Sequence, residues 1–150
     1  MPDPLNQQQR TEAMQQTFIA MPHFIALGME FGAVGDGRAE LSMAYDERFI
    51  GDPETGVIFG GAVSALMDTS CGAAVICHAQ GSPVTATLDL RIDYMRSATP
   101  GQRITARAEC YRITRSVAFV RAIATDHDTT RPVASATGTF TVQRPEETPA

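Results

Sequence analysis

Residues 56–79 are apolar or small almost throughout and read GVIFGGAVSALMDTSCGAAVICHA. The stretch contains no Lys or Arg, and Asp68 is its only carboxylate. Its length and its 3.6-residue pattern predict a helix that begins at Gly60-Gly61, ends at about His78 and crosses a core. The stripe expected to face a sheet consists of Phe59, Ala62, Val63, Leu66, Ser70, Ala73 and Cys77.

Residues on both sides of this helix alternate with a period of two, as strands do. Between 84 and 94 the alternation places Leu88 and Leu90 on one face, and Thr87 on the other with Asp89 and Arg91. Further strands are predicted at about 27–34, 37–44, 104–110, 117–125 and 133–142, and a short helix at 11–21. The order helix, two strands, long buried helix and four strands indicates a two-layer α+β domain.

A chain of 150 residues can form one domain with a substantial core. We expect an N-terminal arm and short helix at 1–17, the domain at 18–143 and a solvated tail at 144–150. Hydrophobic content is 43%, charged content is 19%, and no apolar run has spanning length, which argues against a membrane protein.

Charge and cysteine usage exclude further classes. The formal charge of -5 comes without a basic block, so nucleic acid is not an expected partner. Three cysteines without CxxC spacing indicate neither a disulfide framework nor a zinc site, and we expect no metal. The N-terminus lacks the pattern of a signal peptide, which favours a cytoplasmic location.

Asp68 is the candidate chemical centre. A carboxylate among apolar residues is disfavoured in its charged form unless something hydrogen-bonds or pairs with it. Its neighbours at helical spacing are small, so another backbone or a slender ligand can approach closely; they are Ser64, Ala65, Cys71 and Gly72. The alternative is that this face packs against a second subunit, where Asp68 pairs with a polar group.

Gly60 and Gly61 stand at the expected start of the helix. Free backbone N–H groups there point outward with the positive end of the helix dipole, and such a group can stabilise an oxygen that gains negative charge during acyl transfer. A flexible turn leading into the helix, with no ligand, is the alternative interpretation.

Several phrases resemble the hotdog-fold acyl-CoA thioesterases of the phenylacetate-degradation (PaaI) type. They are GVIFGG, LMDTSCG around Asp68 and VTATLDLRIDYMRSATPG, with weaker likeness in MPHFIALGMEF, RITRSVAFVRAIATD and PVASATGTFTV. The resemblance covers roughly residues 18–142. It implies a long central helix wrapped by an antiparallel sheet, homodimers with joined sheets that assemble into homotetramers, and hydrolysis of an acyl-CoA thioester. No cofactor is implied beyond the coenzyme A of the substrate.

The resemblance also implies roles for single residues. Asp68 would act as nucleophile or as base for the attacking water, a Gly60 or Gly61 N–H would hold the oxyanion, and the Thr87 hydroxyl would come from the other subunit. Coenzyme A would be bordered by Arg96, Ser97, Arg115 and Ser116. Simple alternation makes Thr87 a solvated strand residue instead, and turn arginines commonly serve solubility; these alternatives stay open.

Two positions depart from the family pattern. Phe59 stands where the family has the His of His-Gly-Gly, and Pro53 stands where it has an Asn. Neither side chain can donate a hydrogen bond. The alternative function is therefore a non-catalytic acyl-CoA binding or sensing protein. A hotdog dehydratase ranks low because no His lies near the helix start.

The acyl pocket is expected to be apolar and to take a medium-chain or aromatic acyl group. Phe18, Phe24, Phe59 and Met67 would form part of it. The three histidines, His23, His78 and His127, are interpreted as structural or exposed.

Overall fold

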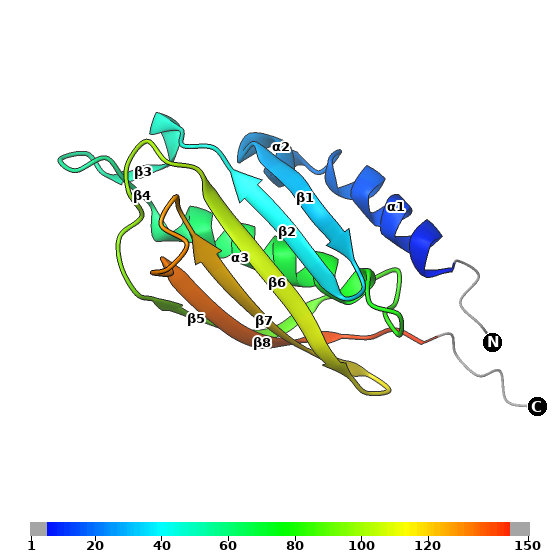
Figure 1. The fold of residues 1–150 in the computed structure, drawn as a ribbon. Helices are drawn as coiled ribbons and strands as arrows, with labels where there is room; N and C mark the ends of the chain where they lie inside the picture. The colour runs from blue at the N-terminus through cyan, green and yellow to red at the C-terminus, as the bar shows by residue number, and fades with distance from the viewer. Residues whose placement is uncertain (1–5, 145–150) are drawn as a thin grey trace, which may run out of the picture.

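A long helix lies across one face of a six-stranded antiparallel sheet in the computed structural model, which describes residues 6–144 (Figure 1). The strands follow the order β1-β2-β6-β7-β8-β5, and a short β3–β4 hairpin stands apart. The elements are α1 (Gln7–Phe18), α2 (Pro22–Ala26), β1 (Met29–Gly35), β2 (Arg38–Met43), η1 (Glu47–Phe49), β3 (Ile50–Asp52), β4 (Val57–Ile58), α3 (Gly60–Ile76), β5 (Thr87–Tyr94), β6 (Ile104–Ile113), β7 (Val117–Thr125) and β8 (Ala134–Thr141).

This arrangement confirms the α+β hotdog architecture expected from the sequence. The α3 residues Leu66 and Ala73 are buried against alternate residues of the sheet, such as Ala106 and Val120. Burying apolar surface between the helix and one face of the sheet supplies the main favourable term in folding. No helix within residues 6–144 is both long and apolar enough to span a membrane.

Phe59 is the member of the predicted stripe that does not face the sheet. It is the N-cap of α3, and 61% of its surface is exposed. A residue at the N-cap has left the helical path, so its side chain need not follow the wheel on which the stripe was drawn. The other six members of the stripe are buried as predicted.

The N-terminal helix begins earlier than the sequence suggested. Asn6 accepts a hydrogen bond from the Gln9 N–H, and the Gln9 side chain accepts one from Asn6 N–H, which is a capping box. Residues 7–10, predicted as loose arm, are therefore helical, whereas 1–5 lie outside the described residues.

Arg10 fixes α1 to the far end of α3. It is 3% exposed, and its guanidinium donates to the carbonyls of Ile76 at 2.8 Å and His78 at 2.6 Å. Gln7 Nε2 donates to the Cys77 carbonyl at 2.8 Å. Carbonyls at a helix C-terminus lack intrahelical partners, and a cation there also interacts favourably with the helix dipole. The polar N-terminal segment thus caps the central helix.

A bulge interrupts the alternation in β5. Thr87 pairs with Phe140 and Asp89 with Thr139, so two steps along β5 match one step along β8. An extra residue in a strand reverses which face the preceding residues occupy. Thr87 consequently shares the inner face with Leu90, while Leu88 is 58% exposed. The predicted pairing of Leu88 with Leu90 on one face is wrong.

Candidate active site

Asp68 and Thr87 form a hydrogen-bonded pair between α3 and β5. The Thr87 hydroxyl donates to Asp68 Oδ1 at 2.7 Å. Thr87 faces the helix because the β5 bulge reverses the alternation, and its hydroxyl contacts Asp68 although the residue is exposed in the single chain. Both residues belong to one chain, whereas the resemblance implied that Thr87 comes from the other subunit. Within residues 6–144, Thr87 is the one hydrogen-bond donor to this carboxylate.

A cavity of about 560 Å³ lies beside this pair. Asp68 and Thr87 line it together with apolar residues of α1 and β8, including Met14, Phe18 and Phe140. Its volume is within the range of small-molecule sites, and a mostly apolar wall with a few polar groups is typical of them. Asp68 itself is half-buried, so the carboxylate is accessible to a molecule in the cavity.

The start of α3 lies away from this cavity. Gly60 and Gly61 open the helix, but neither lines the cavity beside Asp68. Eight residues of helix separate Gly60 from Asp68, a rise of about 12 Å. Within one chain, therefore, the N–H groups of Gly60 and Gly61 are too far away to donate to a substrate carbonyl that lies beside the Asp68 carboxylate.

Two aromatic rings flank the glycines. A Cβ at Gly61 would lie 2.1 Å from the Phe59 ring, so any side chain there would have to displace that exposed ring. On the other side, the Tyr94 hydroxyl donates to the Gly60 carbonyl at 2.9 Å and also contacts the Ser64 hydroxyl. Phe59 lines a separate groove of about 370 Å³ with Phe49 and other residues, not the cavity beside Asp68.

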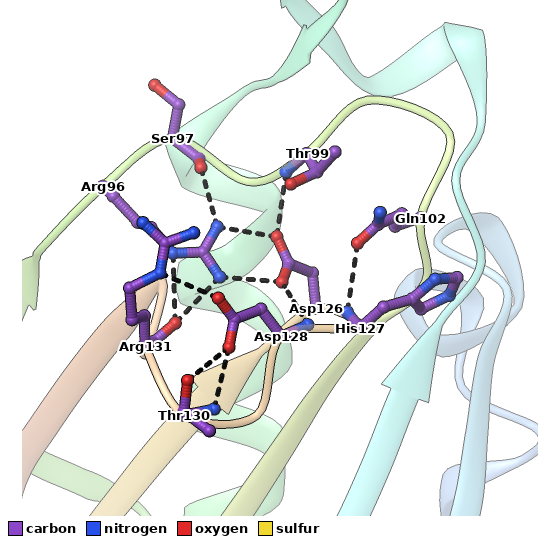
Figure 2. Close-up of polar contacts among 9 residues, drawn as sticks. All are labelled: Arg96, Ser97, Thr99, Gln102, Asp126, His127, Asp128, Thr130 and Arg131. Atoms are coloured by element: carbon purple, nitrogen blue, oxygen red, sulfur yellow. Dashed lines mark hydrogen bonds and ion pairs between the residues drawn. The ribbon is translucent and has the colours of Figure 1, made fainter.

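Arg96 is engaged in an internal cluster (Figure 2). Its two terminal nitrogens donate to the two Asp126 carboxylate oxygens, each at 2.7 Å. The remaining N–H groups donate to the carbonyls of Ser97 and Arg131. A guanidinium has five N–H donors, and all five are used. A phosphate would have to displace one of these bonds, so we remove Arg96 from the proposed coenzyme A ligands. Ser97 takes part in the cluster through its backbone carbonyl.

This cluster affects the charge state of Asp126. The Arg96 guanidinium, with the backbone N–H groups of Thr99 and Asp128, holds the pKa of the Asp126 carboxyl well below its ordinary value. The side chain of Asp126 is fully buried, so this is an internal ion pair that joins the ends of two loops.

Arg115 and Ser116 lie at the opposite end of the sheet from Arg96. They form the β6–β7 turn and are exposed, whereas Asp126, the partner of Arg96, follows the other end of β7. The nine residues of β7 separate the two places. The four predicted coenzyme A residues are therefore not brought together within one chain.

Met67 is not part of a pocket wall. It is 0% exposed and belongs to the core, so its predicted role in the substrate pocket is wrong. Phe24 is also buried, against Phe31, at a ring-centroid distance of 5.3 Å. Of the four predicted pocket residues, Phe18 alone lines the cavity beside Asp68. Helix periodicity separates buried from exposed positions but does not distinguish a core from a cavity.

The thioesterase superfamily matches residues 55–133 of the chain. This is more than half of the sequence and includes α3, Asp68 and Thr87. The chain belongs to the thioesterase superfamily. No curated protein matches the chain.

Solved structures agree with this membership. A protein from Pseudomonas aeruginosa has 36% identity and a TM-score of 0.77, covering 91% of this chain and 99% of its own. A mutant of the phenylacetic acid degradation protein PaaI from Thermus thermophilus has 27% identity and a TM-score of 0.72, covering 82% and 100%. A hypothetical thioesterase with coenzyme A from Streptococcus pneumoniae has 20% identity and a TM-score of 0.72, covering 89% and 96%, and shows the fold alone. The PaaI-type resemblance is confirmed.

In this thioesterase-superfamily chain, two features of the site were missed by sequence reasoning. One is the first part of α1, before residue 11, together with the cavity lining by Met14; Phe18 was the α1 residue expected in the pocket. The capping box at Asn6 and Gln9 was the signal for it. The other is His23, interpreted as structural or exposed, which lines the cavity and whose Nε2 lies 3.4 Å from Thr69 Oγ1.

Asp52, beside one of the two positions that depart from the family pattern, is engaged in a turn of its own. Asp52, next to Pro53, accepts hydrogen bonds from the Thr55 hydroxyl at 2.7 Å and from the Glu54 N–H, and so closes the β3–β4 turn. Within residues 6–144, no group of His, Cys, Asp and Glu is suited to hold a metal ion.

Proposed function

We propose that this protein is a cytoplasmic acyl-CoA thioesterase that hydrolyses a medium-chain or aromatic acyl-CoA to the free acid and coenzyme A. The observation that carries the proposal is the Asp68 carboxylate, held by the Thr87 hydroxyl at 2.7 Å beside a largely apolar cavity. Membership of the thioesterase superfamily supports the reaction class.

Asp68 acts in this proposal as a general base. Its carboxylate takes a proton from a water molecule, and the water oxygen attacks the thioester carbonyl. The carbon–sulfur bond then breaks, and the leaving thiolate of coenzyme A takes up the proton, which returns Asp68 to its carboxylate form. The Thr87 hydroxyl donates to Oδ1 and so fixes the orientation of the carboxylate toward that water. The apolar wall holds the acyl group and limits access of bulk water.

The oxyanion site requires a second copy of the chain. Since Gly60 and Gly61 lie about 12 Å along the helix from Asp68, a homodimer would bring these N–H groups of one copy to the Asp68 of the other. β5 is one of the two edge strands of the sheet, and the exposed side chains of Val84, Leu88 and Met95 lie on it or beside it. An unpaired apolar edge strand favours pairing with another chain. Further assembly into a homotetramer is part of the proposal.

Substitution of Asp68 tests the mechanism. Asp68→Asn keeps the size of the side chain and the hydrogen-bond contact with Thr87 but removes the base. We expect the rate of free-thiol release from a panel of acyl-CoAs to fall at least about 100-fold. Glu47→Gln, which neutralises an exposed carboxylate in η1, is the matched control and retains the wild-type rate. Undiminished turnover by a folded Asp68→Asn protein would remove Asp68 from the mechanism.

A specific observation also favours a non-hydrolytic acyl-CoA binding or sensing protein. The Phe59 ring covers Gly61 at the start of α3, where the family pattern has a hydrogen-bond donor. Titration calorimetry with acyl-CoAs, combined with a thiol assay at high protein concentration, separates the two functions. Binding without thiol release would support the sensor, and measurable release would exclude it.

A further inference from the structure

His23 shares the cavity with Asp68. In the part of the chain that the structure describes, the ionisable side chains on the cavity lining are Arg10, His23 and Asp68. The Arg10 guanidinium donates to the carbonyls of Ile76 and His78, and a guanidinium does not give up its proton in proteins. His23 and Asp68 are therefore the two side chains that can exchange a proton with a molecule in the cavity.

The local structure of α2 directs the His23 ring to the cavity. Pro22 occupies the first position of α2, where its fixed φ and its missing N–H suit the start of a helix. Phe24 is 3% exposed and packs against Phe31 at a ring-centroid distance of 5.3 Å. Successive residues of a helix point about 100° apart, so with Phe24 in the core its neighbour His23 is exposed and lies on the cavity lining.

The imidazole contacts α3 at the residue next to Asp68. His23 Nε2 lies 3.4 Å from Thr69 Oγ1, and Thr69 also lines the cavity. Because consecutive Cα atoms are about 3.8 Å apart, this contact places the imidazole at the turn of α3 that carries the carboxylate. Thr87 reaches the same turn from β5. An imidazole and a hydroxyl from two different elements thus accompany Asp68 at the cavity.

We propose that His23 is the general acid of the reaction and gives a proton to the sulfur of coenzyme A as the thiol leaves. This rests on the proposed thioesterase function and assigns the route of the proton. An imidazole is suited to the role because it both gives and takes a proton near neutral pH.

The step balances with Asp68 as carboxylate and His23 as imidazolium at the start. Asp68 takes a proton from water, and the water oxygen bonds to the carbonyl carbon. The carbon–sulfur bond then breaks, the electron pair goes to sulfur, and the sulfur takes the proton of the imidazolium. The proton on Asp68 passes to the neutral imidazole through water in the cavity, which returns both side chains to their starting forms.

His23→Gln tests the proposal through the leaving group. Glutamine can still bond to the Thr69 hydroxyl, but it cannot transfer a proton. We expect kcat for octanoyl-CoA to fall about 100-fold, whereas the rate with the octanoyl thioester of 4-nitrothiophenol, whose thiolate leaves unprotonated, stays within about threefold. His127→Gln, at an exposed histidine in the turn after β7, is the matched control and retains both rates. Because His23 is exposed, the melting temperature of the variant should stay within about 2 °C of the wild type.

The pH profile gives a second readout. Wild-type kcat/KM for octanoyl-CoA should fall as the pH rises through the titration of an imidazole, and His23→Gln should lack this alkaline limb. Asp68 is the ionisable side chain of α3 beside the imidazole. Other charged side chains on the elements around α2 are Arg10 and Glu12 of α1, Glu30 of β1 and Arg48 of η1. Carboxyl and guanidinium groups ordinarily titrate far from neutral pH, so an alkaline limb near neutrality points to the imidazole.

The outcomes separate this role from the function itself. An equal fall with both leaving groups, an unchanged rate with octanoyl-CoA, or an alkaline limb that persists in His23→Gln would overturn the role of His23 and leave the thioesterase function intact. Absence of thiol release from every acyl-CoA by the wild type would instead overturn the proposed function.

Discussion

Asp68 and Asp126 are both held by side-chain donors, yet their surroundings differ. Asp126 is fully buried and receives two bonds from Arg96 and one from each of two backbone N–H groups. From the described part of the chain, Asp68 receives one bond, from Thr87, and it faces a cavity. A carboxylate whose acceptor sites are filled and whose charge is paired is stable but unreactive. A carboxylate with unused acceptor capacity beside a cavity is able to take a proton from water.

The largest effect, on the free energy of unfolding, is expected when the Arg96–Asp126 ion pair is broken. Arg96→Met keeps the length of the side chain but leaves Asp126 buried without its cation, and we expect a loss of about 3 kcal/mol in the free energy of unfolding. Chemical denaturation measures it. The matched control is Arg131→Met in the same cluster, because Arg131 is 74% exposed and pairs with Asp128 at the surface (Figure 2). That variant is expected to lose less than about 1 kcal/mol. Equal losses of stability in the two variants would contradict the expectation that the buried ion pair contributes more than the exposed one.

A smaller effect, on rate and not on stability, is expected at Thr87. Thr87→Val preserves the shape of the side chain and removes the hydroxyl that orients Asp68. Since a hydrogen bond to a charged group contributes about 1.5–3 kcal/mol, kcat should fall at least about tenfold. Thr87→Ser retains the hydroxyl and should recover most of the rate. If Val and Ser variants lose activity equally, the contribution of Thr87 is one of packing.

The smallest effect concerns acid. The pKa of Asp126 is lower in the folded state than in the unfolded chain, so the unfolded chain binds the proton more readily. The stability from this pair is therefore present above about pH 4 and is lost as the pH falls below it. Denaturation at a series of pH values should show a smaller difference between wild type and Arg96→Met at pH 3 than at pH 6. A constant difference would show that Asp126 does not carry this linkage.

Sequence alone determined the order of the main helices and strands and the central position of α3, but not α2 or the β3–β4 hairpin. Both features follow from the local sequence pattern. A 3.6-residue apolar repeat, such as the one that includes Leu66 and Ala73, gives a helix one apolar face, and that face packs against the apolar face of the strands. Asp68 was selected as the candidate for the same kind of reason, as a lone charge in an apolar segment. The fit of GVIFGG and LMDTSCG to the thioesterases extended this to a reaction class.

Only the tertiary structure decided which side chains meet Asp68. Thr87 faces it because a bulge reverses the alternation of β5, and a bulge depends on pairing with β8, which is distant in sequence. The cavity has α1 as one of its walls, and Phe18 of α1 lines it. Met67 instead belongs to the core. Arg96 is engaged by Asp126, thirty residues further along the chain. Each of these outcomes depends on contacts between distant segments, which periodicity within one segment cannot specify.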